Sequence, residues 1–265
     1  MNHDNERAST PPRVSPTHTI SVAVSRLLFA VFLSCVSIEI ALFVLDATVN
    51  FYRGSPVGAI RRLFNITRED GLASLFAVLL TLAVGVVAWA SYARAKSLGA
   101  RRFTCTGWLF VAILFTYLAI DDGAKIHERL GTALMFTLNS GDSADSNWLD
   151  FYPSYPWQVI FAPILAASGG VVLVFLWKEM SATIERVGVV AALTCLSVAV
   201  ALDFVEGMAD GYSWFVGNFD IRLVTIKHFA KAIEESIEMF GMTLFLVTFL
   251  RHYTRRSGSV FIRFD

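Results

Sequence analysis

The chain has 265 residues and no formal net charge; 55% of its residues are hydrophobic and 17% are charged. Its mean hydropathy of +0.57 excludes an ordinary soluble domain, and the zero net charge gives no electrostatic basis for binding nucleic acid. Several apolar stretches reach the length of about 20 residues that a helix needs to cross the hydrocarbon core. The composition therefore predicts an all-α, polytopic integral membrane helix bundle.

The predicted elements begin with a polar, proline-containing tail over residues 1–18, which is expected to be disordered. Six membrane-spanning helices follow, over about 21–47, 71–95, 105–128, 157–178, 187–207 and 224–250. The membrane domain thus covers residues 19–252, and residues 253–265 form a basic C-terminal tail. Residues 48–70 have room for a short interfacial helix, and the acidic, aromatic segment 140–156 has the composition of an interfacial or lid loop.

Basic residues are concentrated in segments that face the cytoplasm if the N-terminus lies inside. Residues 94–102 carry four of them and residues 251–263 carry another four, although the outer segment 48–70 also carries four arginines. This bias predicts a multi-pass protein of the cell membrane with both termini in the cytoplasm. The three cysteines lie in or beside apolar runs without CxxC spacing, and we expect them to be reduced packing residues.

Nine carboxylates lie in or beside these spans: Glu39, Asp46, Asp121, Asp122, Asp203, Glu206, Glu234, Glu235 and Glu238. Ionisable groups at membrane depth are costly, so they indicate a polar site inside the bundle. The acids fall in the closing halves of spans one, three and five and in the opening half of span six. All therefore lie in one leaflet, the outer one if the N-terminus is inside, and they are predicted to converge. Asp46 is expected to be a solvated helix end, whereas Glu39 lies about two turns inside its span.

The neighbouring basic groups are fewer than the acids: Lys125, His127, His228 and Lys231. In an unbroken third span, Lys125 shares a face with Asp121 and Glu128, and Gly123 is a point where the helix can bend. In the sixth span one stripe carries His228, Lys231, Glu235 and Glu238, of which Glu238 is expected to lie deepest. Spans two and four lack charges in their cores and are expected to be lipid-facing or supporting.

Carboxylates combined with imidazole are typical ligands of Zn, Mn or Fe. The predicted ligands are Asp121, His127, Glu235 and Glu238, with Glu128 or Glu234 as the catalytic base; Glu39, Asp122, Asp203 and Glu206 are additional buried acids. A haem with His127 and His228 as axial ligands is a minor alternative. No ExxH, HExxH or CxxC signature supports a particular metal. The competing interpretation is that Lys125 and Lys231 form simple ion pairs within their own helices.

Two stretches of the sequence resemble motifs of a known protein family. The stretch of Ile120-Asp121-Asp122 followed by residues 126–131 (IHERLG) resembles a "DE…HE" box, and residues 233–241 (IEESIEMFG) resemble an "EE..E..G" box. Together they are similar to a family of uncharacterised polytopic bacterial membrane proteins, roughly over spans three to six. Asp122 departs from the glutamate expected there. The resemblance implies that Asp121, His127, Glu128, Glu234, Glu235 and Glu238 act as one unit, and it implies no activity.

Three functions stay open. The first is a metal-dependent enzyme, a hydrolase or an oxidoreductase, acting on a lipid or another apolar substrate. The second is a cation or proton transporter or channel. Three observations count against it: the acids crowd one leaflet, no polar residues continue toward the inner face, and the sequence has no inverted repeat. The third is a non-catalytic assembly or sensor subunit. Membrane lipids are the expected partners, and a protein partner or homo-oligomer stays open.

Overall fold

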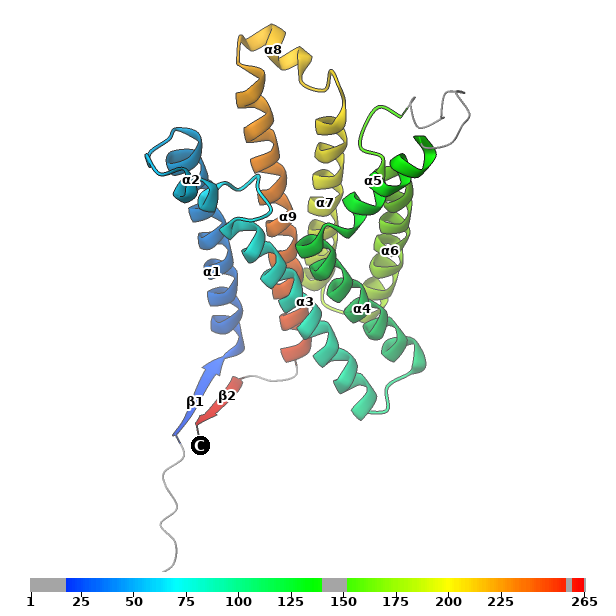
Figure 1. The fold of residues 1–265 in the computed structure, drawn as a ribbon. Helices are drawn as coiled ribbons and strands as arrows, with labels where there is room; N and C mark the ends of the chain where they lie inside the picture. Colours follow the sequence, from blue (N-terminus) through cyan, green and yellow to red (C-terminus); the bar gives the residue numbers. More distant parts are fainter. Residues whose placement is uncertain (1–17, 140–151, 256–258, 265) are drawn as a thin grey trace, which may run out of the picture.

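The computed structural model describes residues 18–139, 152–255 and 259–264 (Figure 1). In chain order the elements are β1 (His18–Ala23), α1 (Val24–Leu45), its π-helical continuation η1 (Asp46–Phe51), α2 (Gly58–Phe64), α3 (Leu72–Ser97), α4 (Arg102–Ala124), α5 (Ile126–Asn139), α6 (Trp157–Glu179), α7 (Thr183–Gly207), α8 (Ser213–Phe219), α9 (Leu223–Thr254) and β2 (Ser259–Phe264). Residues 1–17 of the predicted tail and 140–151 of the predicted lid loop lie outside the described residues.

Five helices are long and apolar enough to cross a membrane: α1 with η1, α3, α4, α6 and α7. The sixth predicted span corresponds to α9, the 32-residue helix whose first half carries the acidic and basic residues. β1 and β2 pair in antiparallel register, so the two ends of the described chain meet at one end of the bundle (Figure 1). A chain whose two ends lie on the same side of the membrane crosses it an even number of times. We therefore infer that α9 is the sixth membrane-spanning helix. The prediction of a helical membrane bundle is confirmed.

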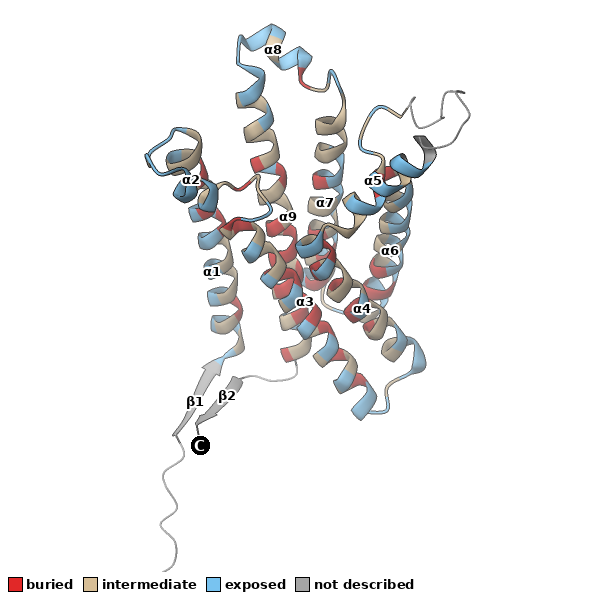
Figure 2. Cartoon of the chain, viewed as in Figure 1, coloured by how far each residue is buried: buried red, intermediate tan, exposed pale blue. Residues whose placement is uncertain are grey.

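The core lies where α3, α4, α7 and α9 pack together, and Figure 2 shows its buried residues near the middle of these helices. Small residues allow α3 and α4 to approach closely. Ala88 and Ala112 are completely buried, and Gly85 lies against the backbone of Thr116. Between α4 and α9, the rings of Trp108, Phe115 and Phe249 meet edge to face. The second predicted span, α3, is therefore a supporting helix on one face, while Leu75, Leu79 and Val86 on its other face point outward. Cys35, Cys105 and Cys195 are free, as predicted.

The predicted third span is interrupted. Lys125 adopts the left-handed conformation (φ 52°, ψ 47°), so α4 ends at Ala124 and α5 leaves in another direction. The expectation of one helix over 105–128 was wrong, and the break lies at Lys125 rather than at Gly123. Its local cause is Asp121, whose Oδ1 accepts the backbone N–H of His127 at 2.9 Å and replaces the helical acceptor.

The segment between α1 and α3 contains the short helix α2, as predicted. The chain reaches it through a sharp turn in which Arg53 has a φ of 56°. Gly54 is required there, because a Cβ on this residue would lie 2.7 Å from the carbonyl oxygen of Thr48. The turn brings α2 back against η1.

Candidate functional site

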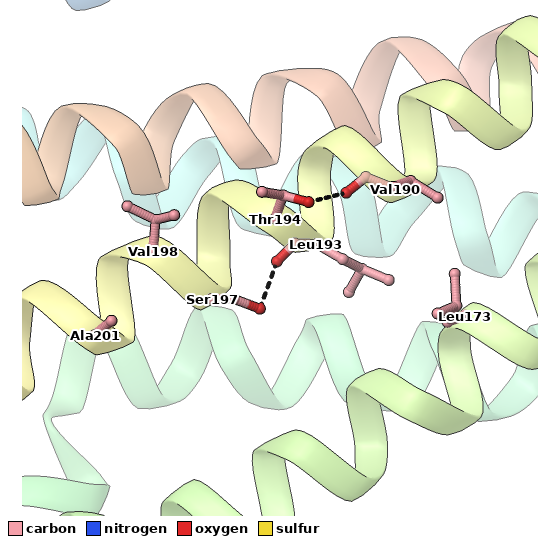
Figure 3. Close-up of a pocket in the computed structure, with 7 residues that line it drawn as sticks. All are labelled: Leu173, Val190, Leu193, Thr194, Ser197, Val198 and Ala201. Carbon is pink, nitrogen blue, oxygen red and sulfur yellow. Dashed lines mark hydrogen bonds between the residues drawn. The ribbon is translucent and has the colours of Figure 1, made fainter.

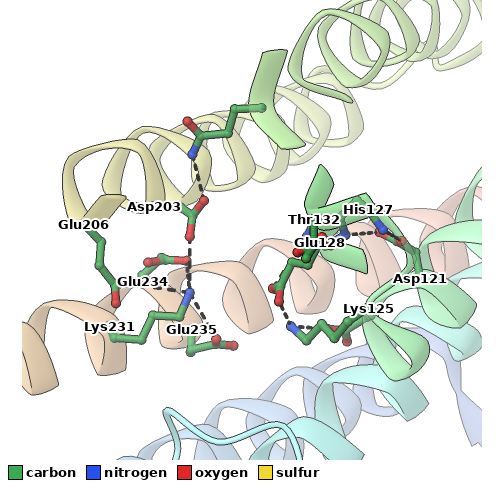
Figure 4. A network of polar contacts seen from close by, with 12 residues as sticks. Asp121, Lys125, His127, Glu128, Thr132, Asp203, Glu206, Lys231, Glu234 and Glu235 are labelled. Atoms are coloured by element: carbon green, nitrogen blue, oxygen red, sulfur yellow. Dashed lines mark hydrogen bonds and ion pairs between the residues drawn. The ribbon is translucent and has the colours of Figure 1, made fainter. Parts of the chain in front are cut away.

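Four carboxylates from two helices surround the ammonium group of Lys231 (Figure 4). Its Nζ lies 2.7 Å from Glu234, 3.5 Å from Asp203, 3.6 Å from Glu235 and 4.0 Å from Glu206. The lysine and Glu234 and Glu235 come from α9, whereas Asp203 and Glu206 come from the end of α7. Four acids against one ammonium leave three negative charges uncompensated when all are ionised. We call these five residues the acidic cluster.

The loop before α6 and the turn after α7 cover the acidic cluster. Gln158 is buried in the first turn of α6; it donates to Asp203 at 2.9 Å and accepts a hydrogen bond from the Tyr152 hydroxyl at 3.2 Å. Tyr212 is buried beside Glu206 and Glu234, and its burial together with these two carboxylates raises its pKa to about 12. The phenol is therefore neutral and keeps its proton as a hydrogen-bond donor.

The glycine that ends α7 lets the covering loop lie flat on the helix. A Cβ on Gly207 would overlap Ser154 Oγ and lie 3.0 Å from the backbone nitrogen of Tyr155. We expect Gly207→Val to displace this loop and to lower the unfolding free energy by about 1–3 kcal/mol. Thermal unfolding in detergent measures the loss. Gly217→Val is the matched control, because a Cβ there meets nothing within 4 Å; equal losses in both variants would contradict the prediction.

An aspartate–histidine pair forms the second part of the site. His127 Nδ1 lies 2.6 Å from Asp121 Oδ2, and the opposite ring nitrogen, Nε2, lies 3.8 Å from Glu128. Because Asp121 holds Nδ1, the neutral imidazole has its acceptor at Nε2. Lys125 lies between Asp122 and Glu128, at 4.0 and 3.8 Å. Helical phase failed to predict the His127–Asp121 pair, because the left-handed residue resets the phase between them.

The two parts of the site are neighbours through α6 and α9. The His127 ring packs on Trp157, with centroids 4.6 Å apart, and the next residue is Gln158, which binds Asp203. On the α9 side, Glu235 interacts electrostatically with both Asp122 and Lys125. Glu238 is half-buried and has no hydrogen-bond or ion-pair partner among the described residues. Asp122, His127, Glu128 and the acidic cluster thus occupy one region at one end of the bundle.

Two predicted members, Asp46 and Glu39, lie elsewhere, at the contact between α1 and α9. Asp46 is only 1% exposed and receives three hydrogen bonds: from His228 at 2.7 Å, from Asn50 at 2.9 Å and from the backbone of Ile66 at 3.2 Å. The expectation that it is a solvated helix end was wrong, because the turn after α1 folds back over it. Glu39 also faces α9, where it accepts a hydrogen bond from Thr243. Most of the predicted acids lie at one end of the bundle and Glu39 lies near its middle, so they do not form a single site.

The three carboxylates that the structure brings within reach of one ion are those of Asp203, Glu206 and Glu234. One carboxylate oxygen from each residue lies within 4.8 Å of the other two. Glu206 Oε2 is buried and receives no hydrogen bond from the described part of the chain. An all-oxygen donor set of this kind fits Mg²⁺, Ca²⁺ or Mn²⁺. This triad differs from the predicted ligands Asp121, His127, Glu235 and Glu238, which stay a prediction, as does the haem alternative.

A groove on the outer side of α6 and α7 is separate from this site (Figure 3). Its volume is about 320 Å³, and it is lined by Leu173, Val190, Leu193, Thr194, Ser197, Val198 and Ala201. The hydroxyls of Thr194 and Ser197 donate to carbonyls of their own helix. Asp203 lies two residues beyond Ala201, about 200° round the helix, and so points away from the groove.

A further polar group lies at the opposite end of the bundle, where the sequence indicated no polar continuation. Glu185 is 1% exposed, and its Oε2 lies 3.6 Å from His252 Nδ1 and 3.8 Å from Arg255. The other ring nitrogen of His252 lies 4.0 Å from Glu179. Glu185 lies in the first turn of α7, two residues before the predicted fifth span, so it adds a buried acid at this end, and the single leaflet for the nine acids of the spans stays a prediction. The pair was missed because Glu185 and His252 stand near the ends of their helices in sequence and only packing buries them.

Comparison with known proteins identifies a family without assigning a function. The family described as a domain of unknown function (DUF8692) matches residues 28–253. No curated protein and no solved structure matches the chain.

Proposed function

Because the chain belongs to the DUF8692 family, whose description names no activity, we propose its function from the site alone: a membrane enzyme that depends on a divalent cation. The observation that carries the proposal is the triad of Asp203, Glu206 and Glu234 around a single ammonium group. One ammonium leaves three of the four negative charges unbalanced, and a divalent cation held by the triad would compensate two of them. Such an ion supplies a Lewis acid and an acidified water when bound.

The neighbouring side chains have the arrangement needed for acid–base chemistry. Asp121 fixes the His127 ring, which leaves Nε2 as the atom that accepts a proton and later returns it. Glu128 lies beside that nitrogen at 3.8 Å and would stabilise the imidazolium. Gln158 orients Asp203, while Lys231 holds Glu234 in place. The neutral hydroxyl of Tyr212 is a donor for an oxygen that gains negative charge.

We further propose that the substrate is a lipid or another apolar molecule with a hydrolysable group near the membrane surface. The site lies at the ends of membrane-crossing helices rather than in a soluble domain, so its substrate would arrive along the membrane. With both termini in the cytoplasm, this end of the bundle would face outward.

The decisive test is the metal content of the purified, detergent-solubilised protein. We expect about one equivalent of Mg²⁺, Ca²⁺ or Mn²⁺ in the wild type and a loss of affinity of at least about tenfold in Glu206→Gln and in Asp203→Asn. Both substitutions keep side-chain size and remove one negative charge. Equilibrium dialysis with elemental analysis measures the change. Asp220→Asn, an exposed acid in the turn after α8, is the control and should bind like the wild type. A wild type free of divalent cations at millimolar supply would refute the proposal.

A second candidate is a proton or cation transporter, and one observation favours it. Ionisable groups line α9 at the acidic cluster, at Glu39 and again at the Glu185–His252 pair. Against it, the rings of Trp108, Phe115, Phe245 and Phe249 form a buried apolar layer between the two ends. Cation and proton flux in liposomes is the test, and flux abolished by Glu185→Gln would place transport first. The non-catalytic subunit stays a prediction.

A further inference from the structure

Glu39 is an acid without a counter-charge near the centre of its helix. It lies 15 residues after the start of α1 and 12 before the end of η1, so about 18 Å or more of helix separates it from either end. The side chain is 6% exposed and accepts one hydrogen bond, from Thr243 Oγ1 at 2.6 Å. Thr243 is completely buried, and the other ionisable neighbour is the thiol of Cys35 on the same helix. Among the described residues, no basic group of any packed element faces Glu39.

Asp46, seven residues further along, is an acid that the fold surrounds with hydrogen-bond donors. That carboxylate receives three hydrogen bonds, one of them from an imidazole. Glu39 receives a single bond from a neutral hydroxyl. A buried carboxylate without a cation or several donors is expensive, and such a group becomes neutral by taking up a proton. A carboxylic acid can share its one hydrogen bond with the Thr243 hydroxyl without leaving a buried charge.

The position of α1 decides when that proton can leave. The helix packs on α9 through Phe32 against Phe240 and Phe43 against Phe229, whereas Phe29, Leu33 and Ile40 point outward. Glu39 therefore lies at the α1–α9 contact, closed from water. Release of its proton in this position would leave an uncompensated charge between the two helices.

We propose that Glu39 is a proton-binding site in the middle of the bundle and that its bound proton permits α1 to pack against α9. The reaction is uptake of one proton from water by the carboxylate, and its reversal requires α1 to move away. The inference is independent of the divalent cation. Thr243 lies nine residues beyond Glu234, the α9 member of the triad, and about 180° round the helix from it, and the Thr243 hydroxyl faces Glu39 of α1.

Infrared difference spectroscopy of the full chain in lipid nanodiscs at neutral pH tests the proposal. The spectrum of wild type minus Glu39→Gln is expected to contain the carbonyl stretch of a protonated carboxylic acid. Glutamine keeps the size of the side chain and an oxygen that accepts from Thr243. The control Glu69→Gln removes an exposed acid, and its difference spectrum should contain only carboxylate bands.

A second variant keeps the test decisive if Glu39→Gln does not fold. In Thr243→Val the glutamic acid remains and loses its hydrogen bond, so its carbonyl band should move to higher frequency relative to the wild type. A Glu39→Gln difference spectrum with carboxylate bands and no acid carbonyl would overturn the proposal. A Thr243→Val spectrum in which only a carboxylate band moves would overturn it equally, and neither result would bear on the cation site.

Discussion

Lys231→Met is expected to destabilise the protein by about 3–5 kcal/mol in the absence of divalent cations. It removes the one cation that, among the described residues, forms ion pairs with this partly buried group of four carboxylates. Methionine retains the length and the apolar part of the lysine side chain, so packing changes little. The free energy of unfolding in mixed micelles, with a chelator present, measures the loss. Lys227→Met, at an exposed position on the same helix, should change it by less than about 0.5 kcal/mol.

The same variant also reports on the cation. If Asp203, Glu206 and Glu234 hold a divalent ion, adding it at about a hundred times its dissociation constant should restore roughly 2.7 kcal/mol. The double variant Lys231→Met, Glu206→Gln should recover less, since one ligand charge is missing. A Lys231→Met protein as stable as the wild type in chelator would contradict this account of the acidic cluster.

Asp46→Ala is expected to cost about 3–5 kcal/mol, the second large effect, because it removes one partner of a buried, hydrogen-bonded pair. The carboxylate joins three segments: its own helix end through Asn50, the linker before α3 through Ile66, and α9 through His228. Its loss leaves all three donors without their acceptor, one of them the buried backbone N–H of Ile66, and frees the end of α1 from α9. Unfolding in mixed micelles measures the effect.

A double-mutant cycle separates the Asp46–His228 contact from general damage at the site. His228→Ala alone also loses the stacking of the ring on Phe51, at 4.8 Å between centroids. The double variant should nevertheless be less destabilised than the sum of the two singles, by about 0.5–3 kcal/mol. Additive losses would show that Asp46 and His228 do not stabilise each other.

The order of the membrane helices was predictable because it depends on local properties. Hydrophobic length and the absence of charge identify α1, α3, α4, α6 and α7 directly. The placement of Glu39, Asp203 and Glu234 in buried or half-buried positions also followed from the sequence, because a charge inside an apolar run must face the bundle. That Asp203, Glu206, Glu234 and Glu235 lie at the same end of the bundle followed from the alternating direction of successive spans.

The sequence by itself therefore determined where each ionisable group lies along the bundle axis, because the position along a helix increases by a fixed rise with each residue. Only the tertiary structure decided which groups meet. Rotation about a helix advances about 100° per residue, so a single left-handed residue at Lys125 changes every later phase and brings His127 onto Asp121. Helix packing likewise placed Asp46 and Glu39 at the α1–α9 contact and the acidic cluster at the α7–α9 contact, and it buried Glu185 beside His252. These pairings depend on contacts between distant segments, which no local pattern of residues contains.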